Sequence, residues 1–168
     1  MIVIEALRVW SWRGLREVAL EGLSPDLNLI VGPNESGKSR LFEALHHALF
    51  ERYKGSGFGK ADLQGWHTDD SPEVEVVFVA GGHRYTLHKR FLKKEFARLE
   101  GAGHTWRDDD AEAKVRELLG TRDFDRKLST EHMGIWPLLW LPQGASGTPP
   151  HEHLTEDGRG RIRDVLAA

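Results

Sequence analysis

One eight-residue segment, Gly32–Ser39, constrains the fold of this chain more than any other feature of its sequence. The segment reads Gly-Pro-Asn-Glu-Ser-Gly-Lys-Ser and fits the pattern G-x-x-x-x-G-K-[ST]. An apolar run at Leu27–Val31 precedes it and predicts a strand. Apolar residues at the spacing of one helical face follow it over Leu41–Phe50. The sequence therefore predicts a strand, a glycine-rich loop and a helix in succession.

This succession predicts a binding site for the phosphate chain of a nucleotide. The backbone N–H groups of a glycine-rich loop at a helix N-terminus point toward one place, and the helix dipole adds positive potential there. Lys38 would reach the β and γ phosphates, and the hydroxyl of Ser39 would take a position on Mg²⁺. The loop residues expected to contact the nucleotide are Asn34, Glu35, Ser36, Gly37, Lys38, Ser39 and Arg40.

Composition narrows the class of protein further. A chain of 168 residues suits one domain, and the absence of cysteine excludes disulfides and cysteine zinc sites. No signal peptide or membrane-length apolar stretch is evident, so we expect a cytoplasmic protein, with association with the nucleoid as an option, and no membrane partner. The net charge of −3 argues against a protein that coats nucleic acid with its whole surface.

Positive charge is nevertheless concentrated in one stretch. Between His83 and Arg98 there are six lysines and arginines against one acid, Glu95. Two interpretations are open: a solvated strand face, which is the usual role of such runs, or a patch that contacts the phosphate backbone of DNA. The candidate DNA contacts are Arg84, Lys89, Arg90, Lys93, Lys94 and Arg98.

The rest of the chain alternates strand and turn signals. A β-hairpin region is predicted over 73–106, with the Gly81-Gly82 pair at its first turn, and the acidic run that starts at Asp108 predicts the beginning of a helix. Other expected elements are strands at Ile2–Trp12, Val18–Leu20, Glu95–Glu100 and Ile135–Leu141, a mobile loop at about 54–72, and the first turns of a helix at 160–168.

Three motifs together resemble one family, the SMC-like DNA-repair and chromosome ATPases, which is the group of SbcC (the Rad-fifty type), RecF and RecN. The loop at Gly32–Ser39 is similar to that group's phosphate-binding loop. Arg13, in the turn Ser11–Leu15, resembles a basic residue that the group places near the nucleotide. The segment Leu139–Gly144 is similar to the group's Q-loop, in which the residue matching Gln143 senses the γ-phosphate through Mg²⁺ and the attacking water.

The resemblance implies an α/β fold: the N-terminal lobe of an ABC-type P-loop ATPase head, with a mixed sheet, an antiparallel β-hairpin portion and flanking helices, over residues 1–168. It implies ATP and Mg²⁺ as cofactors, with Lys38 and Gln143 as catalytic residues and Ser39 and Gln143 toward the metal. The implied partners are a C-terminal lobe on the same or a separate chain, a second head in an ATP-dependent dimer, and DNA, with a nuclease as a further option.

The family's C-terminal lobe carries a Ser-Gly-Gly signature and an apolar strand that ends in Asp-Glu, and neither is found in this sequence. We therefore expect ATP hydrolysis only from a completed head, with little or none from this chain alone. Two other functions remain open: a P-loop kinase of small molecules, and a module that binds a nucleotide in order to dimerise but does not hydrolyse it.

Overall fold

A computed structural model of the chain describes residues 2–55, 61–65 and 69–123, and the single residues 128, 129, 132, 133, 136 and 159. The chain divides into two units, Met1–Leu118 and Leu119–Ala168. Each unit is described here by itself. The expected Q-loop with Gln143, the segment 160–168 and most of Ile135–Leu141 lie outside the described residues.

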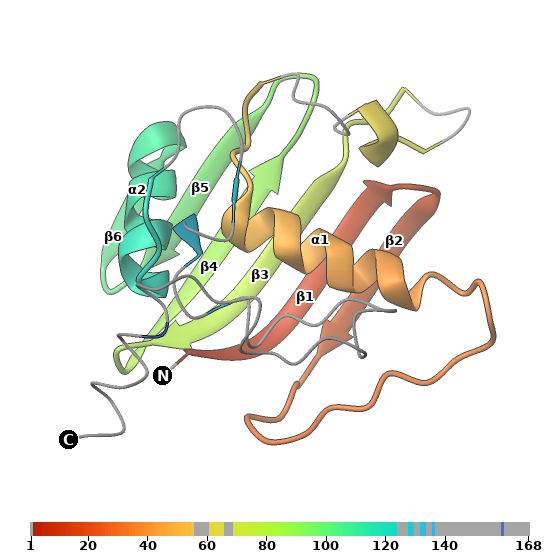
Figure 1. Cartoon of the computed structure of the whole chain (residues 1–168), viewed down its shortest axis with the longest axis horizontal. Helices are drawn as coiled ribbons and strands as arrows, with labels where there is room; N and C mark the ends of the chain where they lie inside the picture. The colour runs from red at the N-terminus through yellow and green to blue at the C-terminus, as the bar shows by residue number, and fades with distance from the viewer. Residues whose placement is uncertain are drawn as a thin grey trace. The chain divides into compact units, whose positions relative to one another are not determined.

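A six-stranded sheet forms the body of the first unit (Figure 1). Its strands lie in the order β2-β1-β3-β4-β5-β6, and every neighbouring pair is antiparallel. The bounds are β1 Ile2–Trp12, β2 Leu15–Glu21, β3 Glu73–Ala80, β4 His83–Arg90, β5 Phe96–Gly101 and β6 His104–Arg107. The predicted strands at the N-terminus and in the hairpin region are thereby confirmed.

Two helices cover one face of this sheet, α1 (Lys38–Phe50) and α2 (Asp108–Leu119). Figure 1 shows α1 crossing in front of the central strands and α2 beside β5 and β6. Leu41, Ala44 and Leu49 of α1 are buried, as the apolar spacing of this segment predicts. A short 3₁₀ helix, Ala61–Leu63, lies within the segment expected to be a loop, and its Leu63 is only 1% exposed.

Successive side chains along a strand point to opposite sides, so the sheet has two different faces. Val74, Val76 and Phe78 of β3 and Leu87 of β4 are fully buried toward the helices. On the other face, Glu73 lies opposite Arg90 and Glu75 opposite His88, whereas Val77 lies opposite Thr86. The face opposite to the two described helices is therefore polar where β3 begins and β4 ends.

The β3–β4 hairpin closes through a two-residue turn. Gly81 and Gly82 have φ angles of 57° and 80°, which is the left-handed pair that a tight hairpin turn of the I′ type requires. The register runs without interruption from Ala80 opposite His83 to Glu73 opposite Arg90. The hairpin predicted from the Gly-Gly signal is therefore confirmed.

The strand predicted at Leu27–Val31 is wrong. These residues belong to no strand, and Leu27, Leu29 and Val31 are 86%, 82% and 80% exposed. A strand needs a neighbour with which to exchange backbone hydrogen bonds. None of the six described strands pairs with this apolar run.

The few described residues of the second unit form local hydrogen bonds. The N–H of Arg122 donates to the carbonyl oxygen of His132 at 2.8 Å, and the indole N–H of Trp136 donates to that of Leu119 at 2.8 Å. Trp136 lies in a helical turn, because its own N–H donates to the carbonyl oxygen of Met133, so the predicted strand is wrong at this position. No helix in the described part of the chain is long and apolar enough to cross a membrane.

Candidate nucleotide-binding loop

The Gly32–Ser39 segment leads directly into α1. Gly37 is the residue before the helix and has a φ of 92°, a left-handed conformation that glycine adopts without strain. A Cβ atom on Gly37 would lie 2.6 Å from Cδ2 of Leu15 at the start of β2. The backbone conformation therefore favours glycine here, and a larger residue would also displace the side chain of Leu15.

Lys38, the first residue of α1, folds back over the loop. Its Nζ donates to the carbonyl oxygens of Gly32 at 2.8 Å and Pro33 at 2.6 Å, and to Oγ of Ser36 at 3.3 Å. The ammonium group therefore lies at the loop, where the N-terminal end of α1 also directs its positive potential. This donor set fits a phosphate chain, because both the cation and the helix end favour negative charge at one place.

The remaining loop residues leave the site open to solvent. Asn34, Glu35, Ser36, Ser39 and Arg40 are all exposed. Ser39 lies in the first turn of the helix, next to Lys38, so its hydroxyl fits the predicted role toward Mg²⁺.

Glu35 is notable for its backbone conformation, and Arg40 for the position of its side chain. Glu35 has a φ of 65°, so the loop contains a left-handed residue that is not glycine. The Nη1 atom of Arg40 is 3.5 Å from the position that a Cβ of Gly14 would take, which places its guanidinium beside the β1–β2 turn.

The same turn holds Arg13, but its side chain is directed at the body of α1. Arg13 has a φ of 45°, and its backbone N–H donates to the carbonyl oxygen of Leu63 at 2.8 Å. Its guanidinium forms an ion pair with Glu43 on α1. Glu43 is not among the predicted site residues, because no local pattern signals a pairing between residues thirty positions apart.

The basic run at 84–98 does not form one continuous patch. Lys89 is fully buried, with its Nζ 2.8 Å from Oε1 of Glu112 and 2.8 Å from the carbonyl oxygen of Glu51. The expectation that Lys89 contacts DNA is therefore wrong. Alternation along β4 turns this side chain toward the helices instead of toward solvent.

Most of the other basic side chains in the run have acidic partners elsewhere in the chain. The pairs are Arg84 with Glu5 at 2.7 Å, Arg90 with Glu73 at 2.6 Å, Lys93 with Asp69 at 3.0 Å and Arg98 with Glu100 at 3.2 Å. All four acids lie outside the run, so counting charge along the sequence overstated its positive character. These pairings favour the interpretation as a solvated strand face.

Comparisons with known proteins agree with this geometry. The family described as AAA domain matches residues 2–138. The chain is similar to the DNA double-strand break repair Rad50 ATPase of Methanopyrus kandleri, with 30% identity over 134 residues that cover 73% of this chain and 15% of the relative. It is also similar to the DNA replication and repair protein RecF of Phocaeicola vulgatus, with 26% identity over 110 residues that cover 58% of this chain and 29% of the relative.

The fold has a solved counterpart as well. A chain from work on the structural biochemistry of ATP-driven dimerization and DNA-stimulated activation of SMC ATPases matches with a TM-score of 0.51 and 18% identity, over 70% of this chain and 78% of that chain. This match bears on the fold alone. The expected family resemblance and fold class are confirmed by these comparisons, although the chain spans less than a third of either curated relative.

Proposed function

The chain belongs to the AAA domain family, and from this membership we propose that it is the ATP-binding N-terminal lobe of an SMC-like ATPase head that acts in DNA double-strand break repair or recombination. The observation that carries the proposal is the loop before α1, where the backbone conformation of Gly37 favours glycine and Lys38 lies over the loop. The Rad50 and RecF relatives support a role in DNA repair. A role in DNA repair would place the protein in the cytoplasm, with association with the nucleoid as an option.

In this proposal ATP binds with its phosphates against the loop and the N-terminus of α1. The Nζ of Lys38 would exchange the carbonyl oxygens of Gly32 and Pro33 for the β and γ phosphates, and Ser39 would hold Mg²⁺. Mg²⁺ would neutralise charge that develops on the phosphates, and the loop N–H groups would stabilise it further. Gln143 would orient the attacking water.

We propose that hydrolysis needs a C-terminal lobe and a second head. The exposed apolar side chains at Leu27, Leu29 and Val31 support this, because they lie immediately before the loop and their segment pairs with no strand in the described part of the chain. Strands supplied by a completing lobe would bury them. At about 25 cal/mol per Å² of apolar surface, burial of each side chain would contribute on the order of 2 kcal/mol to association.

The kinase alternative receives less support. An arginine-rich lid would need arginines that are free to close over a substrate, whereas Arg84, Arg90 and Arg98 form ion pairs with acids at distances of 2.6 to 3.2 Å. The non-hydrolysing dimerisation module differs from the leading proposal only in turnover. Phosphate release by a completed head separates these two functions.

The test measures binding of fluorescent ATP with Mg²⁺, and phosphate release, for the wild-type chain, Lys38→Ala and the control Lys54→Ala. Each protein is measured with and without duplex DNA, and with and without the C-terminal lobe of a relative. We expect binding by wild type and Lys54→Ala, loss of binding in Lys38→Ala, and turnover only when the lobe is added. Equal binding by Lys38→Ala would overturn the site, and rapid turnover by the chain alone would overturn the need for completion.

A further inference from the structure

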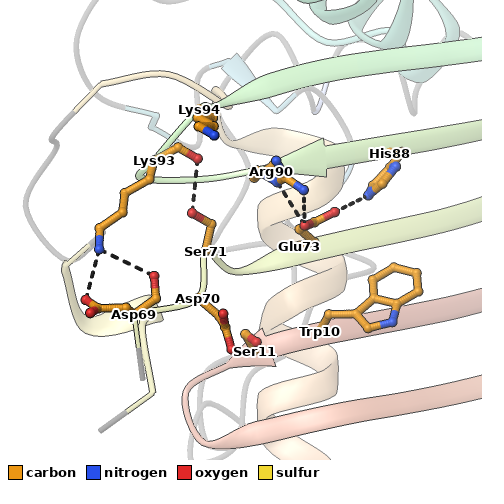
Figure 2. Close-up of a pocket in the computed structure, with 10 residues that line it drawn as sticks. All are labelled: Trp10, Ser11, Asp69, Asp70, Ser71, Glu73, His88, Arg90, Lys93 and Lys94. Carbon is orange, nitrogen blue, oxygen red and sulfur yellow. Dashed lines mark hydrogen bonds and ion pairs between the residues drawn. The ribbon is translucent and has the colours of Figure 1, made fainter. Parts of the chain in front are cut away.

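A second concave site lies away from the nucleotide loop, on the face of the sheet opposite to the two described helices. It is a pocket of about 500 Å³, within the range of ligand sites in proteins. Its walls come from the end of β1, the residues before β3, the end of β4 and the turn that follows β4 (Figure 2). None of the residues 32–40 lines it.

Two flat side chains, Trp10 and His88, line this pocket, and Phe96 lies next to His88 without lining it. The rings of Trp10 and His88 have centroids 5.9 Å apart, and His88 lies edge-on to Phe96 at 4.9 Å. The guanidinium of Arg90 lies 5.3 Å from the centroid of the Phe96 ring. The rings of Trp10 and His88 therefore offer a surface within the pocket on which a nucleobase can stack.

Three carboxylates (Asp69, Asp70 and Glu73) and three cations (Arg90, Lys93 and Lys94) line the pocket. Glu73 pairs with Arg90 at 2.6 Å and contacts His88 at 2.7 Å, and Lys93 is paired with Asp69 at 3.0 Å. Lys94 is exposed and has neither a hydrogen bond nor an ion pair within the described ranges. A phosphate group at the rim can therefore contact the ammonium of Lys94.

The backbone around the pocket is strained. Ser11, Leu92 and Lys94 have φ angles of 50°, 74° and 50°, although none of them is glycine. A left-handed conformation costs a non-glycine residue on the order of 1–2 kcal/mol. Strain of this kind is typical of functional sites, where it is retained because it aims a group at a ligand. Here the strained turn carries Lys94 to the rim of the pocket.

We propose that this pocket binds one nucleotide unit, with its base against Trp10 and its single phosphate at Lys94. The unit is either part of a DNA single strand or a free nucleoside monophosphate. The carboxylates of Asp69 and Asp70, which also line the pocket, disfavour a triphosphate, so this site and the loop at Lys38 take different ligands. The proposal does not depend on ATP binding at the loop.

The test is carried out with the whole chain in a Lys38→Ala background, so that ATP binding at the loop cannot contribute. Fluorescence anisotropy measures the affinity for a labelled oligothymidylate strand, and unlabelled thymidine monophosphate, duplex DNA and ATP compete for it. Trp10→Ala is expected to weaken binding about tenfold or more, because stacking of one base on an aromatic ring contributes that much. Trp106→Ala, a half-buried tryptophan outside the pocket, serves as the matched control and leaves the affinity unchanged.

Lys94→Gly keeps the proposal testable if Trp10→Ala does not fold. This change relieves the left-handed backbone, so we expect a higher melting temperature together with weaker binding and a shallower dependence on salt. If thymidine monophosphate competes with the labelled strand, the ligand of the pocket is a free nucleotide. If only strands compete, the ligand is DNA. No binding of either probe, or unchanged binding in both Trp10→Ala and Lys94→Gly, would overturn the pocket assignment without affecting the proposal for Lys38.

Discussion

The ammonium of Lys89 on β4 lies 2.8 Å from Oε1 of Glu112 on α2, and both side chains are buried. The same lysine donates to the carbonyl oxygen of Glu51, the residue that follows α1, and the N–H of Tyr53 donates to Glu112 at 3.1 Å. Arg116 donates to the other oxygen of this carboxylate at 3.2 Å. One buried ion pair therefore connects the end of α1, the middle of α2 and the sheet.

Replacement of Lys89 by Met is expected to lower the free energy of unfolding by about 3–5 kcal/mol, because it leaves the carboxylate of Glu112 buried without its main cationic partner. The double variant Lys89→Met, Glu112→Leu should recover much of that loss. Lys54→Met is the control, because the two side chains of its pair with Asp109 are 43% and 67% exposed and the pair should contribute little to stability. Urea unfolding gives the free energy of unfolding of each variant. A decrease of less than about 1 kcal/mol in Lys89→Met would contradict the prediction.

Gly37→Ala should reduce ATP affinity at least tenfold. The added methyl would lie 2.6 Å from Cδ2 of Leu15 in a residue with φ of 92°, so either the Leu15 side chain or the loop must shift, next to the place where the phosphates are expected. Gly22→Ala is the matched control, because Gly22 also has a positive φ, of 65°, but nothing lies within 4 Å of its added carbon. Both variants incur left-handed strain, and only Gly37→Ala should change binding in titrations with fluorescent ATP. Equal affinities in the two variants would contradict the assigned role of Gly37.

Local sequence patterns were sufficient to predict the elements that form from residues close together in the sequence. The Gly81-Gly82 turn and the alternating residues on either side predicted the β3–β4 hairpin. The apolar spacing over Leu41–Phe50 predicted the helix α1, which begins three residues earlier, at Lys38. The apolar run at Leu27–Val31 failed as a strand because strand formation also needs a neighbouring strand, which a single segment does not reveal.

Contacts between distant segments account for the features that sequence reasoning missed. The basic run predicts that Lys89 is exposed, but its partner Glu112 lies on another element, which the run does not reveal. The ion pair of Arg13 is not predicted either, because its partner Glu43 lies far along the chain. Trp10 and Lys94 line one pocket only because β1 and β4 both pair with β3. Each of these relationships is set by topology, which residue spacing alone does not encode.

The stability of the chain should fall as the pH drops from about 6.5 to about 4, in part because of His46 on α1. Burial lowers the pKa of His46 from 6.5 to about 4. In this window the unfolded chain binds a proton that the folded chain does not, so protonation favours unfolding, by up to about 3 kcal/mol in the limit. His46→Gln should flatten this dependence, whereas His83→Gln at the exposed hairpin turn should not. Melting temperatures across the pH range measure this dependence. An unchanged slope of melting temperature against pH in His46→Gln would exclude His46 as the cause.

The same substitution at two leucines should distinguish the exposed apolar run before the loop from the core of the chain. Leu49→Ser places a hydroxyl at a position that is 2% exposed and should destabilise the chain by about 3 kcal/mol. Leu29→Ser acts at a position that is 82% exposed and should leave the stability of the free chain within about 0.5 kcal/mol of wild type.

If strands of a completing lobe cover Leu29, however, Leu29→Ser should weaken association with that lobe about tenfold and reduce the phosphate release gained from it. Urea unfolding of the free chain and a titration with the C-terminal lobe of a relative measure the two effects separately. Unchanged association in Leu29→Ser would mean that the apolar run before the loop is not where the head is completed, because a side chain buried on assembly cannot be exchanged for serine without loss of affinity.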